Sequence, residues 1–419
     1  ILAQASLAHP LASLLTRAGG MARRGATQAR PREGGGEVPR ELDVQVSSLG
    51  LGVLAELRLP SGTDVQVVKG MLEERLGTPV AEQRLVCGAE VLDDDRSLRQ
   101  LSSGAGKVAL TLVHVPRQMA ISGSGDTTLR LWDIEFGGTS GKSTILRGHD
   151  SPVHCVAVDW PSRRAISGAA DGALRLWDLE SATSLKELRL RAHVATSIYC
   201  LAVDWTSFRA LGGTSDSALC LWDLEKECTL QDMRGHSGAV RCVAVNWPER
   251  RAVSGSSDDT LRLWDLDTGE SLRVFCGSAH NGWRRPGHTH DVLCVSVDWS
   301  SMRALSGSGD DSIRLWDLRH TEPVLELCGH DRDVLCVDVD WAGARALSGS
   351  GDETLRLWDL DSGRAVRTLR GHEDHVSGVA ATWPAQRAVT SSHDGSLRLW
   401  DLETGETLRE LRGHSFRVL

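Results

Sequence analysis

The sequence predicts two folded parts: a small α+β domain, followed by a larger all-β body built from seven copies of one four-stranded unit. A segment close to LRLWD returns seven times in the second part. Each copy follows a short alternating strand and a tight turn, as in AVSGSSDDTLRLWD (252–265). Residues 41–114 instead combine strand patterns with one amphipathic helix. The 419 residues also exceed what a single hydrophobic core usually holds.

The repeated unit ends in a Trp-Asp pair, and successive copies lie between 42 and 52 residues apart. An Asp precedes each Trp by six residues, and a Gly-His pair precedes most innermost strands. Repeats of this length, made of short strands and turns, are typical of four-stranded antiparallel sheets arranged around an axis. The Trp residues that mark the copies are Trp132, Trp177, Trp222, Trp264, Trp316, Trp358 and Trp400.

These motifs resemble the WD-repeat β-propeller family over about 300 residues. The resemblance implies an all-β seven-bladed β-propeller. It also implies, in each blade, a buried hydrogen-bond chain of a His, a strand hydroxyl, the turn Asp and the Trp indole. Because this constellation recurs in blade after blade, we interpret it as scaffolding and not as a set of catalytic triads. Besides the Trp residues, its expected members are His149, Ser167 and Asp171; His236, Ser254 and Asp258; His288, Ser306 and Asp310; His330, Ser348 and Asp352; and His372, Thr390 and Asp394.

Two copies depart from this pattern. In the third copy Gly212 replaces the hydroxyl, and His193 is offset by one residue, so the network is expected to be broken there. The first copy has Ser122, Asp126 and Trp132 but no preceding His. The last Gly-His pair, with His414, has no Trp after it. We therefore expect His414 to complete the first blade, because sharing one blade between the chain ends removes an exposed sheet edge.

Six further Trp residues end the innermost strands, and each is followed four residues later by an Arg. We expect each guanidinium to stack on its indole and staple its own hairpin, and we prefer this reading to a docking surface. The pairs are Trp160–Arg164, Trp205–Arg209, Trp247–Arg251, Trp299–Arg303, Trp341–Arg345 and Trp383–Arg387.

The longest insertion, residues 276–290, holds the remaining Trp. Trp283, Arg284 and Arg285 are candidate protein contacts, since loops with aromatic and Arg side chains often bind partners. Cys276, His280, His288 and His290 lie nearby, but their irregular spacing fits no zinc pattern. We predict no metal site and no cofactor.

Residues 41–114 read as two strands, a helix, two strands joined by a turn, and a last strand. The stretch resembles ubiquitin-like domains, most closely in QRLVCGAEVLDDDRSL (83–98). The resemblance implies a small α+β ubiquitin-like (β-grasp) domain, with a hydrophobic recognition patch at Leu49, Val86 and Val113. Alternatively, Val86 and Val113 are simply strand core. The chain runs on past His114 without a free Gly-Gly end, so we expect this domain to bind partners and not to be conjugated.

One strand fits both parts of the chain. Aligning MAISG (119–123) with RAISG (164–168) makes residues 110–114 an inner propeller strand. A ubiquitin-like sheet needs the same residues at its centre and would lose two ladders without them. We therefore assign residues 108–114 to the small domain. The expected domains are a disordered leader or transit-like segment at 1–40, the ubiquitin-like domain at 41–114 and the propeller at 115–419.

The charge distribution and the cysteine positions limit the kinds of ligand and the cellular compartments that we expect for this protein. Residues 1–40 carry six Arg and two Glu, which suits either a disordered leader (or upstream sequence before Met21) or an organelle transit segment. The whole chain has a net charge of −9, which argues against nucleic acid as the main ligand. No apolar run reaches membrane-spanning length. One apolar repeat position holds cysteines that we expect to be buried thiols, consistent with the cytoplasm or nucleus: Cys155, Cys200, Cys242, Cys294 and Cys336.

No catalytic constellation emerges from the sequence, so we predict a non-enzymatic adaptor that is monomeric within a larger complex. The propeller would hold a protein client, and the ubiquitin-like domain would recruit ubiquitin–proteasome machinery. Arg319 completes a W-D-x-R motif that resembles those of propellers serving cullin–RING ligases. The alternative is a ribosome-assembly factor similar to the Notchless family, with EVLDDD (90–95) supplying an acidic contact. A third class is a small catalytic function in the central channel.

Overall fold

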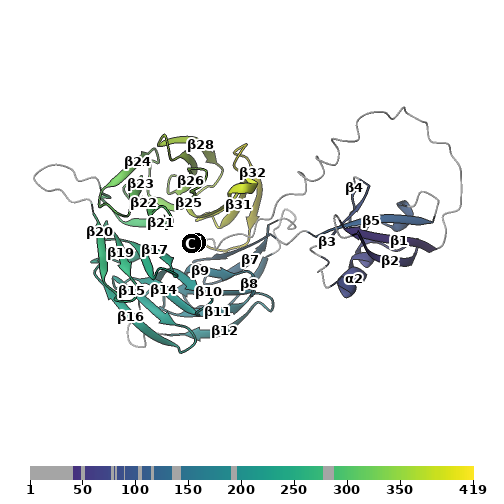
Figure 1. The fold of residues 1–419 in the computed structure, drawn as a ribbon, viewed down its shortest axis with the longest axis horizontal. Coiled ribbons are helices and arrows are strands. Elements are labelled where there is room, and N and C mark those ends of the chain that lie inside the picture. Colours follow the sequence, from purple (N-terminus) through teal and green to yellow (C-terminus); the bar gives the residue numbers. More distant parts are fainter. Residues whose placement is uncertain are drawn as a thin grey trace, which may run out of the picture. The chain divides into compact units, whose positions relative to one another are not determined.

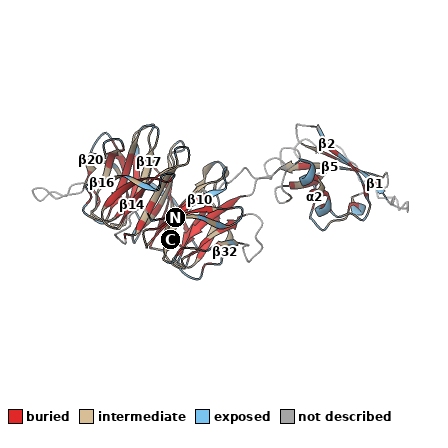
Figure 2. Ribbon diagram, turned by 90° about the horizontal axis from the view of Figure 1, so that it is seen from below, coloured by how far each residue is buried: buried red, intermediate tan, exposed pale blue. Residues whose placement is uncertain are grey.

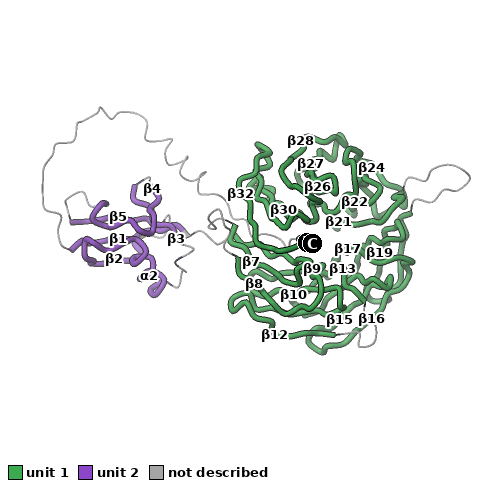
Figure 3. Tube along the Cα trace, turned by 180° about the vertical axis from the view of Figure 1, so that it is seen from behind, with its two compact units in different colours: residues 1–7, 118–419 green, residues 8–117 purple. Residues whose placement is uncertain are grey.

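The computed structural model describes residues 41–48, 52–76, 80, 83–88, 90–101, 106–114, 118–134, 143–189, 196–276 and 287–419. The chain divides into two compact units, one formed by residues 118–419 and the other by the described residues before them (Figure 3). In both units the buried residues follow the strands (Figure 2). Within the described ranges, no helix is long and apolar enough to cross a membrane.

Among its described residues, the smaller unit is a five-stranded sheet with one α-helix packed on it. Its sheet order is β2-β1-β5-β3-β4, with β1 and β5 parallel and the other neighbours antiparallel. The apolar spacing predicts the helix correctly, because Val65, Val68 and Leu72 lie fully buried on one face of α2. Its elements are β1 (Glu41–Ser48), β2 (Gly52–Pro60), α2 (Val65–Leu76), β3 (Gln83–Cys87), β4 (Glu90–Val91), the 3-10 helix η2 (Leu98–Gln100) and β5 (Lys107–His114).

Strand β5, which fits two domains by sequence, lies at the centre of this sheet. Val44 pairs with Val108 on one side, and Leu85 pairs with Leu112 on the other. Val108, Leu110 and Leu112 point into the core beneath α2, since alternate strand residues face opposite sides. Both ladders of β5 therefore belong to the small unit.

The larger unit contains, among its described residues, one three-stranded and six four-stranded antiparallel sheets. We number them 1 to 7 along the chain. Figure 1 shows them side by side around a common axis, with the first strand of each four-stranded sheet innermost. Sheet 1 contains β6 (Met119–Gly123), β7 (Leu129–Asp133) and β8 (Ser143–Leu146). Sheet 2 contains β9 (Val153–Asp159), β10 (Arg164–Ala169), β11 (Leu174–Asp178) and β12 (Thr183–Leu188).

The other five sheets repeat the arrangement of sheet 2. Sheet 3 contains β13 (Ile198–Asp204), β14 (Arg209–Thr214), β15 (Ala218–Asp223) and β16 (Cys228–Arg234). Sheet 4 contains β17 (Val240–Asn246), β18 (Arg251–Ser256), β19 (Leu261–Asp265) and β20 (Ser271–Phe275). Sheet 5 contains β21 (Val292–Asp298), β22 (Arg303–Ser308), β23 (Ser312–Asp317) and β24 (Pro323–Cys328). Sheet 6 contains β25 (Val334–Asp340), β26 (Arg345–Ser350), β27 (Thr354–Asp359) and β28 (Arg364–Arg370). Sheet 7 contains β29 (Val376–Thr382), the 3-10 helix η3 (Trp383–Ala385), β30 (Arg387–Ser392), β31 (Ser396–Asp401) and β32 (Thr407–Arg412).

Neighbouring sheets are held together by apolar side chains between them. Each Trp of the repeat is buried and packs against the preceding sheet, as Trp177 does against Ile121 and Leu129. A glycine in the second strand permits the close approach: a Cβ on Gly255 would lie 2.6 Å from the Sγ of Cys242 and from a methyl carbon of Val292 in sheet 5. The five cysteines at the predicted repeat position are buried, and all ten cysteines are free.

The C-terminal residues lie along the inner edge of sheet 1. Ser124 forms a β-bridge with Val418, and the Leu419 amide donates to the Gly123 carbonyl at 3.0 Å. The Val418 amide also donates to Ser392 in sheet 7 at 3.1 Å. A shared apolar cluster joins Trp132 of sheet 1 to sheet 7. The two ends of the repeat array are therefore in direct contact.

Candidate functional site

The repeated polar network is complete in sheet 4. Trp264 Nε1 donates to Ser254 Oγ at 2.7 Å, His236 Nε2 lies 2.7 Å from the same hydroxyl, and His236 Nδ1 lies 2.8 Å from Asp258 Oδ2. Because the indole can only donate, the Ser254 hydroxyl accepts from it, and His236 links this hydroxyl to the Asp258 carboxylate.

Four more sheets have the same connections. In sheet 1 the His comes from the far end of the chain, with His414 Nε2 2.9 Å from Ser122 Oγ and Nδ1 2.9 Å from Asp126 Oδ2. Trp132 donates to that hydroxyl at 2.8 Å. The corresponding sets are His288, Ser306, Asp310 and Trp316; His330, Ser348, Asp352 and Trp358; and His372, Thr390, Asp394 and Trp400.

The electrostatics of this network suit a structural role. Burial lowers the pKa of His288 and His414, with their Asp partners acting in the opposite direction. Burial alone would raise the pKa of Asp126, but hydrogen bonds from Thr128 and His414 outweigh it and lower the pKa to about 2. In sheets 1, 4, 5, 6 and 7 each imidazole already uses both nitrogens inside the protein. It has no nitrogen left to accept a proton from a substrate.

Two sheets depart from the full network. In sheet 3, where Gly212 replaces the hydroxyl, Trp222 Nε1 is buried and has no hydrogen-bond partner within the described part of the chain. His193 lies outside the described residues. In sheet 2, His149 Nε2 lies 2.7 Å from Ser167 Oγ, and Trp177 donates to that hydroxyl at 2.8 Å. His149 Nδ1, however, is buried without a partner there, although the sequence supplies Asp171.

The predicted stapling of each inner-strand Trp by its own Arg is wrong for Arg345. Its guanidinium lies 5.4 Å from the ring centroid of Trp383 in sheet 7, rather than stacking within its own hairpin on Trp341. Arg345 also donates to Gln386 of sheet 7 at 3.1 Å. Asp338 accepts from the Trp383 indole at 3.2 Å. These contacts join sheets 6 and 7, so a pairing rule based on spacing within one repeat fails for Arg345.

The predicted hydrophobic patch of the small unit stays a prediction, because the structure describes Val86 and Val113, both on the open face of the sheet, but not Leu49. Val86 is only 5% exposed, although it faces away from the helix-covered core, so a partner could reach little of its side chain. Val113 is half-buried, and Leu49 lies outside the described residues. Elsewhere on the same face, along β1, β2 and the start of β5, most of the exposed residues are polar.

The candidate contacts on the larger unit fall into two groups. Trp283, Arg284 and Arg285 lie outside the described residues. Arg319 is exposed, but its guanidinium donates to the Ser301 carbonyl at 3.1 Å and lies 3.7 Å from Asp317. The W-D-x-R arginine is therefore held against its own sheet.

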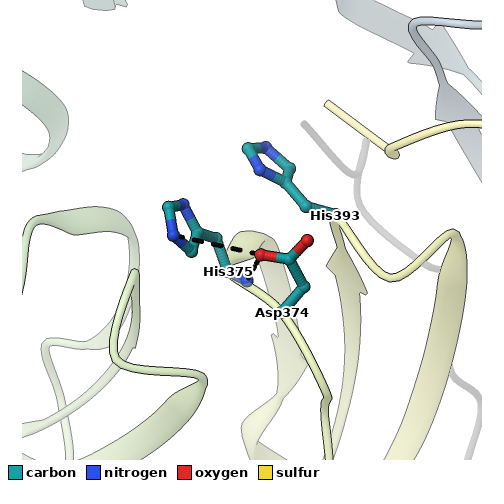
Figure 4. Close-up of side chains that lie close together, drawn as sticks. All are labelled: Asp374, His375 and His393. Carbon is teal, nitrogen blue, oxygen red and sulfur yellow. Dashed lines mark hydrogen bonds and ion pairs between the residues drawn. The ribbon is translucent and has the colours of Figure 1, made fainter.

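A cluster that the sequence analysis missed lies at the turns of sheet 7. Asp374, His375 and His393 each offer one ligand atom, and these atoms all lie within 4.8 Å of one another (Figure 4). The two imidazoles stack with ring centroids 5.2 Å apart and an interplanar angle of 26°. The signal in the sequence is the alignment of the repeats, since sheet 7 alone has His at both positions. Sequence spacing does not reveal it, because the two His are 18 residues apart.

Comparison with known proteins agrees with the repeat pattern. Five segments match the family described as "WD domain, G-beta repeat": residues 141–178, 227–265, 282–317, 321–359 and 363–401. These matches support a WD-repeat protein, a class whose repeats indicate a protein-interaction scaffold.

Curated relatives share only a short stretch with this chain. A segment of 31 residues is 61% identical to Eukaryotic translation initiation factor 3 subunit I of Xenopus tropicalis and of Xenopus laevis, and 58% identical to that of Danio rerio. The similarity covers 7% of this chain, and the chain spans 10% of the length of each relative.

Proposed function

We propose that this protein is a non-enzymatic adaptor made of a closed seven-bladed propeller and a ubiquitin-like domain. The propeller holds a protein client, and the ubiquitin-like domain recruits ubiquitin–proteasome machinery. The chain works as a monomer within a larger complex in the cytoplasm or nucleus. The relatives are named as a subunit of a translation initiation factor, which is consistent with a role of this chain within a complex.

The internal chemistry of the larger unit supports the adaptor proposal. The His, Ser and Asp side chains that could suggest catalysis are buried and paired with one another in sheets 1, 4, 5 and 6. Sheet 7 has Thr in place of Ser in the same arrangement. Polar groups used in this way hold turns in place, and the loops they support remain available to bind partners.

The observation that carries the recruiting role is the open face of the five-stranded sheet. Helix α2 covers one face, whereas alternate residues of β1, β2 and β5 are exposed on the other. Strand order β2-β1-β5-β3-β4 with a single covering helix is the arrangement expected of a ubiquitin-like sheet. The exposed residues include Asp43, Gln45, Glu56, Arg58, Lys107 and Ala109, and they line a shallow depression. We therefore centre the docking surface on Ala109 rather than on Val86.

A binding measurement with the full chain tests this role. Ala109→Arg adds a long charged side chain at the centre of the open face without altering the core. We expect wild type to bind purified proteasome or ubiquitin-ligase particles and Ala109→Arg to bind at least tenfold more weakly. Val67→Arg, at an exposed position on α2, is the matched control and should bind as wild type does. Equal binding by Ala109→Arg and wild type would reject the docking surface.

A second candidate function is ribosome assembly, as in the Notchless family. It is favoured by an acidic turn after β4, where Asp93 and Asp95 are exposed while Asp94 pairs with the buried Lys69. These two carboxylates could reach a metal ion on a partner. On this alternative, Asp93→Asn with Asp95→Asn removes pre-ribosomal particles from the purified complex, and Ala109→Arg does not.

A further inference from the structure

The seven sheets provide an internal comparison for the cluster in sheet 7. In every sheet the residue before the turn Asp donates one backbone hydrogen bond that is 2.8 to 3.0 Å long. In sheets 2 to 7 the acceptor lies 18 positions earlier in the chain, and in sheet 1 it is Arg417 near the C-terminus. The fold therefore brings two side-chain positions together seven times. The pairs are Arg417 and Gly125, Pro152 and Ala170, Ser197 and Ser215, Ala239 and Ser257, Asp291 and Gly309, Asp333 and Gly351, and His375 and His393.

Only the sheet 7 pair consists of two metal-ligating side chains. The backbone bond forms equally well with Gly, Ala or Ser at the second position, so the fold does not require His393. The preceding residue, Asp374, places a carboxylate at the same turn, with its Oδ1 3.9 Å from His375 Nε2. The turn is already ordered by the His375 amide, which donates to that oxygen at 2.8 Å.

The side chains are accessible and their nitrogens are available. The side chains of Asp374 and His375 are 48% and 39% exposed. Within the described residues, no ring nitrogen of His375 or of His393 forms a hydrogen bond, so both imidazoles can offer lone pairs. Asp374 and His393 also line a depression with Gly395, Ser415 and Phe416, which gives an ion a path in from solvent.

We propose that Asp374, His375 and His393 bind a divalent transition-metal ion, with Zn²⁺ the ion their chemistry suits best. Two imidazoles and one carboxylate are a common zinc donor set, and three protein ligands leave a position for water or a partner's side chain. Donors around a tetrahedral Zn²⁺ lie on the order of 3.4 Å apart, given Zn–ligand distances of about 2.0–2.1 Å. The partly exposed His375 and Asp374 side chains can close the remaining gap by rotation. Arg417, which also lines the depression, opposes a cation there, and the Asp374 carboxylate offsets it.

The other sheets supply natural replacements for each ligand. His393→Ser introduces the residue that sheets 3 and 4 have at this position, and His375→Ala introduces the residue of sheet 4. Both variants are therefore expected to fold. The matched control is His290→Ala, which removes an exposed His beside Asp291 at the corresponding turn of sheet 5, where the second position is Gly309.

The experiment is a titration of tag-free, chelator-treated full-length protein with ZnCl₂, followed by calorimetry. Visible absorption after Co²⁺ addition reports the coordination geometry. We expect one tight Zn²⁺ site in wild type and in His290→Ala. Affinity should fall at least tenfold in His393→Ser and in His375→Ala, and the Zn²⁺-induced rise in melting temperature should be lost in both. If His393→Ser binds Zn²⁺ as wild type does, or if wild type binds none at 1:1 stoichiometry, the proposal is wrong. Circular dichroism of the metal-free variants separates loss of a ligand from loss of the fold.

Discussion

His414 Nδ1 lies 2.9 Å from Asp126 Oδ2, although 288 residues separate the two along the chain. The same His414 ring reaches Ser122 Oγ at 2.9 Å, and the next amide, of Ser415, donates to Asp126 at 3.0 Å. In four other sheets the corresponding network joins residues that are close together in the sequence. In sheet 1 it joins residues from both ends of the repeat array. It therefore couples sheet 1 to sheet 7.

Replacing His414 by Ala should weaken this closure. The change leaves Ser122 and Asp126 without their shared partner, and we expect it to cost about 2–4 kcal/mol of unfolding free energy. His320→Ala, at an exposed His in sheet 5, is the control and should change stability by less than about 0.5 kcal/mol. Denaturant unfolding followed by Trp fluorescence measures both, and a neutral His414→Ala would show that the ring is not closed by this contact.

Gly212→Ser should not repair the network of sheet 3. A Cβ on Gly212 would lie 2.5 Å from Cζ3 and 2.7 Å from Cη2 of the buried Trp222 ring. The new hydroxyl could accept from Trp222 Nε1, but overpacking a rigid, buried indole typically costs about 1–3 kcal/mol. We expect a lower melting temperature in calorimetry. A rise would mean that the indole can move to the position its counterparts occupy.

Lowering the pH should destabilise the larger unit through His149. Burial lowers the pKa of His149 from its ordinary 6.5 to about 4, while Asp171 acts in the opposite direction. The unfolded chain then binds a proton more readily than the folded one between these values. The stability from the neutral ring is complete above about pH 6.5 and is lost progressively as the pH falls toward 4. Between pH 7.5 and 5 the loss is about 2 kcal/mol.

The matched variant for this prediction is His149→Gln, which keeps a polar side chain but removes the titration. Its unfolding free energy should fall less steeply than that of wild type over the same pH range. Parallel curves for the two proteins would show that His149 does not carry the pH dependence.

Val86→Asp should act on folding and not on recognition alone. Val86 is nearly buried, and a carboxylate there would lose its hydration, at a cost of about 2–4 kcal/mol. Val53→Asp, at a 54% exposed position of the same sheet, should be tolerated. Thermal unfolding compares the melting temperatures of the two variants directly. Equal melting temperatures would mean that Val86 behaves as a surface residue and can serve as a partner contact.

The repeated parts of the fold could be predicted because each copy of the repeat can be compared with the other copies. A Trp, an Asp and a hydroxyl at constant spacing define the turn in six of the seven copies, and the unmatched Ser122 and Asp126 predict the unmatched His414 as their partner. The central position of β5 in its sheet could be predicted for a different reason. A sheet of this topology needs its middle strand, whereas a C-terminal segment can stand in at the edge of sheet 1.

What could not be predicted depends on contacts between sheets. Arg345 stacks on Trp383 of the next sheet, and spacing within one repeat carries no information about that choice. Val86 alternates like a surface residue, yet its burial depends on what packs around the open face. The pairing of His375 with His393 results from a backbone bond across the turn. It becomes visible in the sequence only once the seven copies are aligned at that bond.

The identity of the proteins that co-purify with the full-length chain tests the adaptor role most directly. Quantitative mass spectrometry should compare wild type, Ala109→Arg and the control Val67→Arg. We predict that proteasome or ubiquitin-ligase subunits are recovered with wild type and Val67→Arg and are lost from Ala109→Arg, while client proteins held by the larger unit are recovered with all three. Recovery of the same ubiquitin-pathway proteins with Ala109→Arg, or recovery of pre-ribosomal particles in their place, would contradict it.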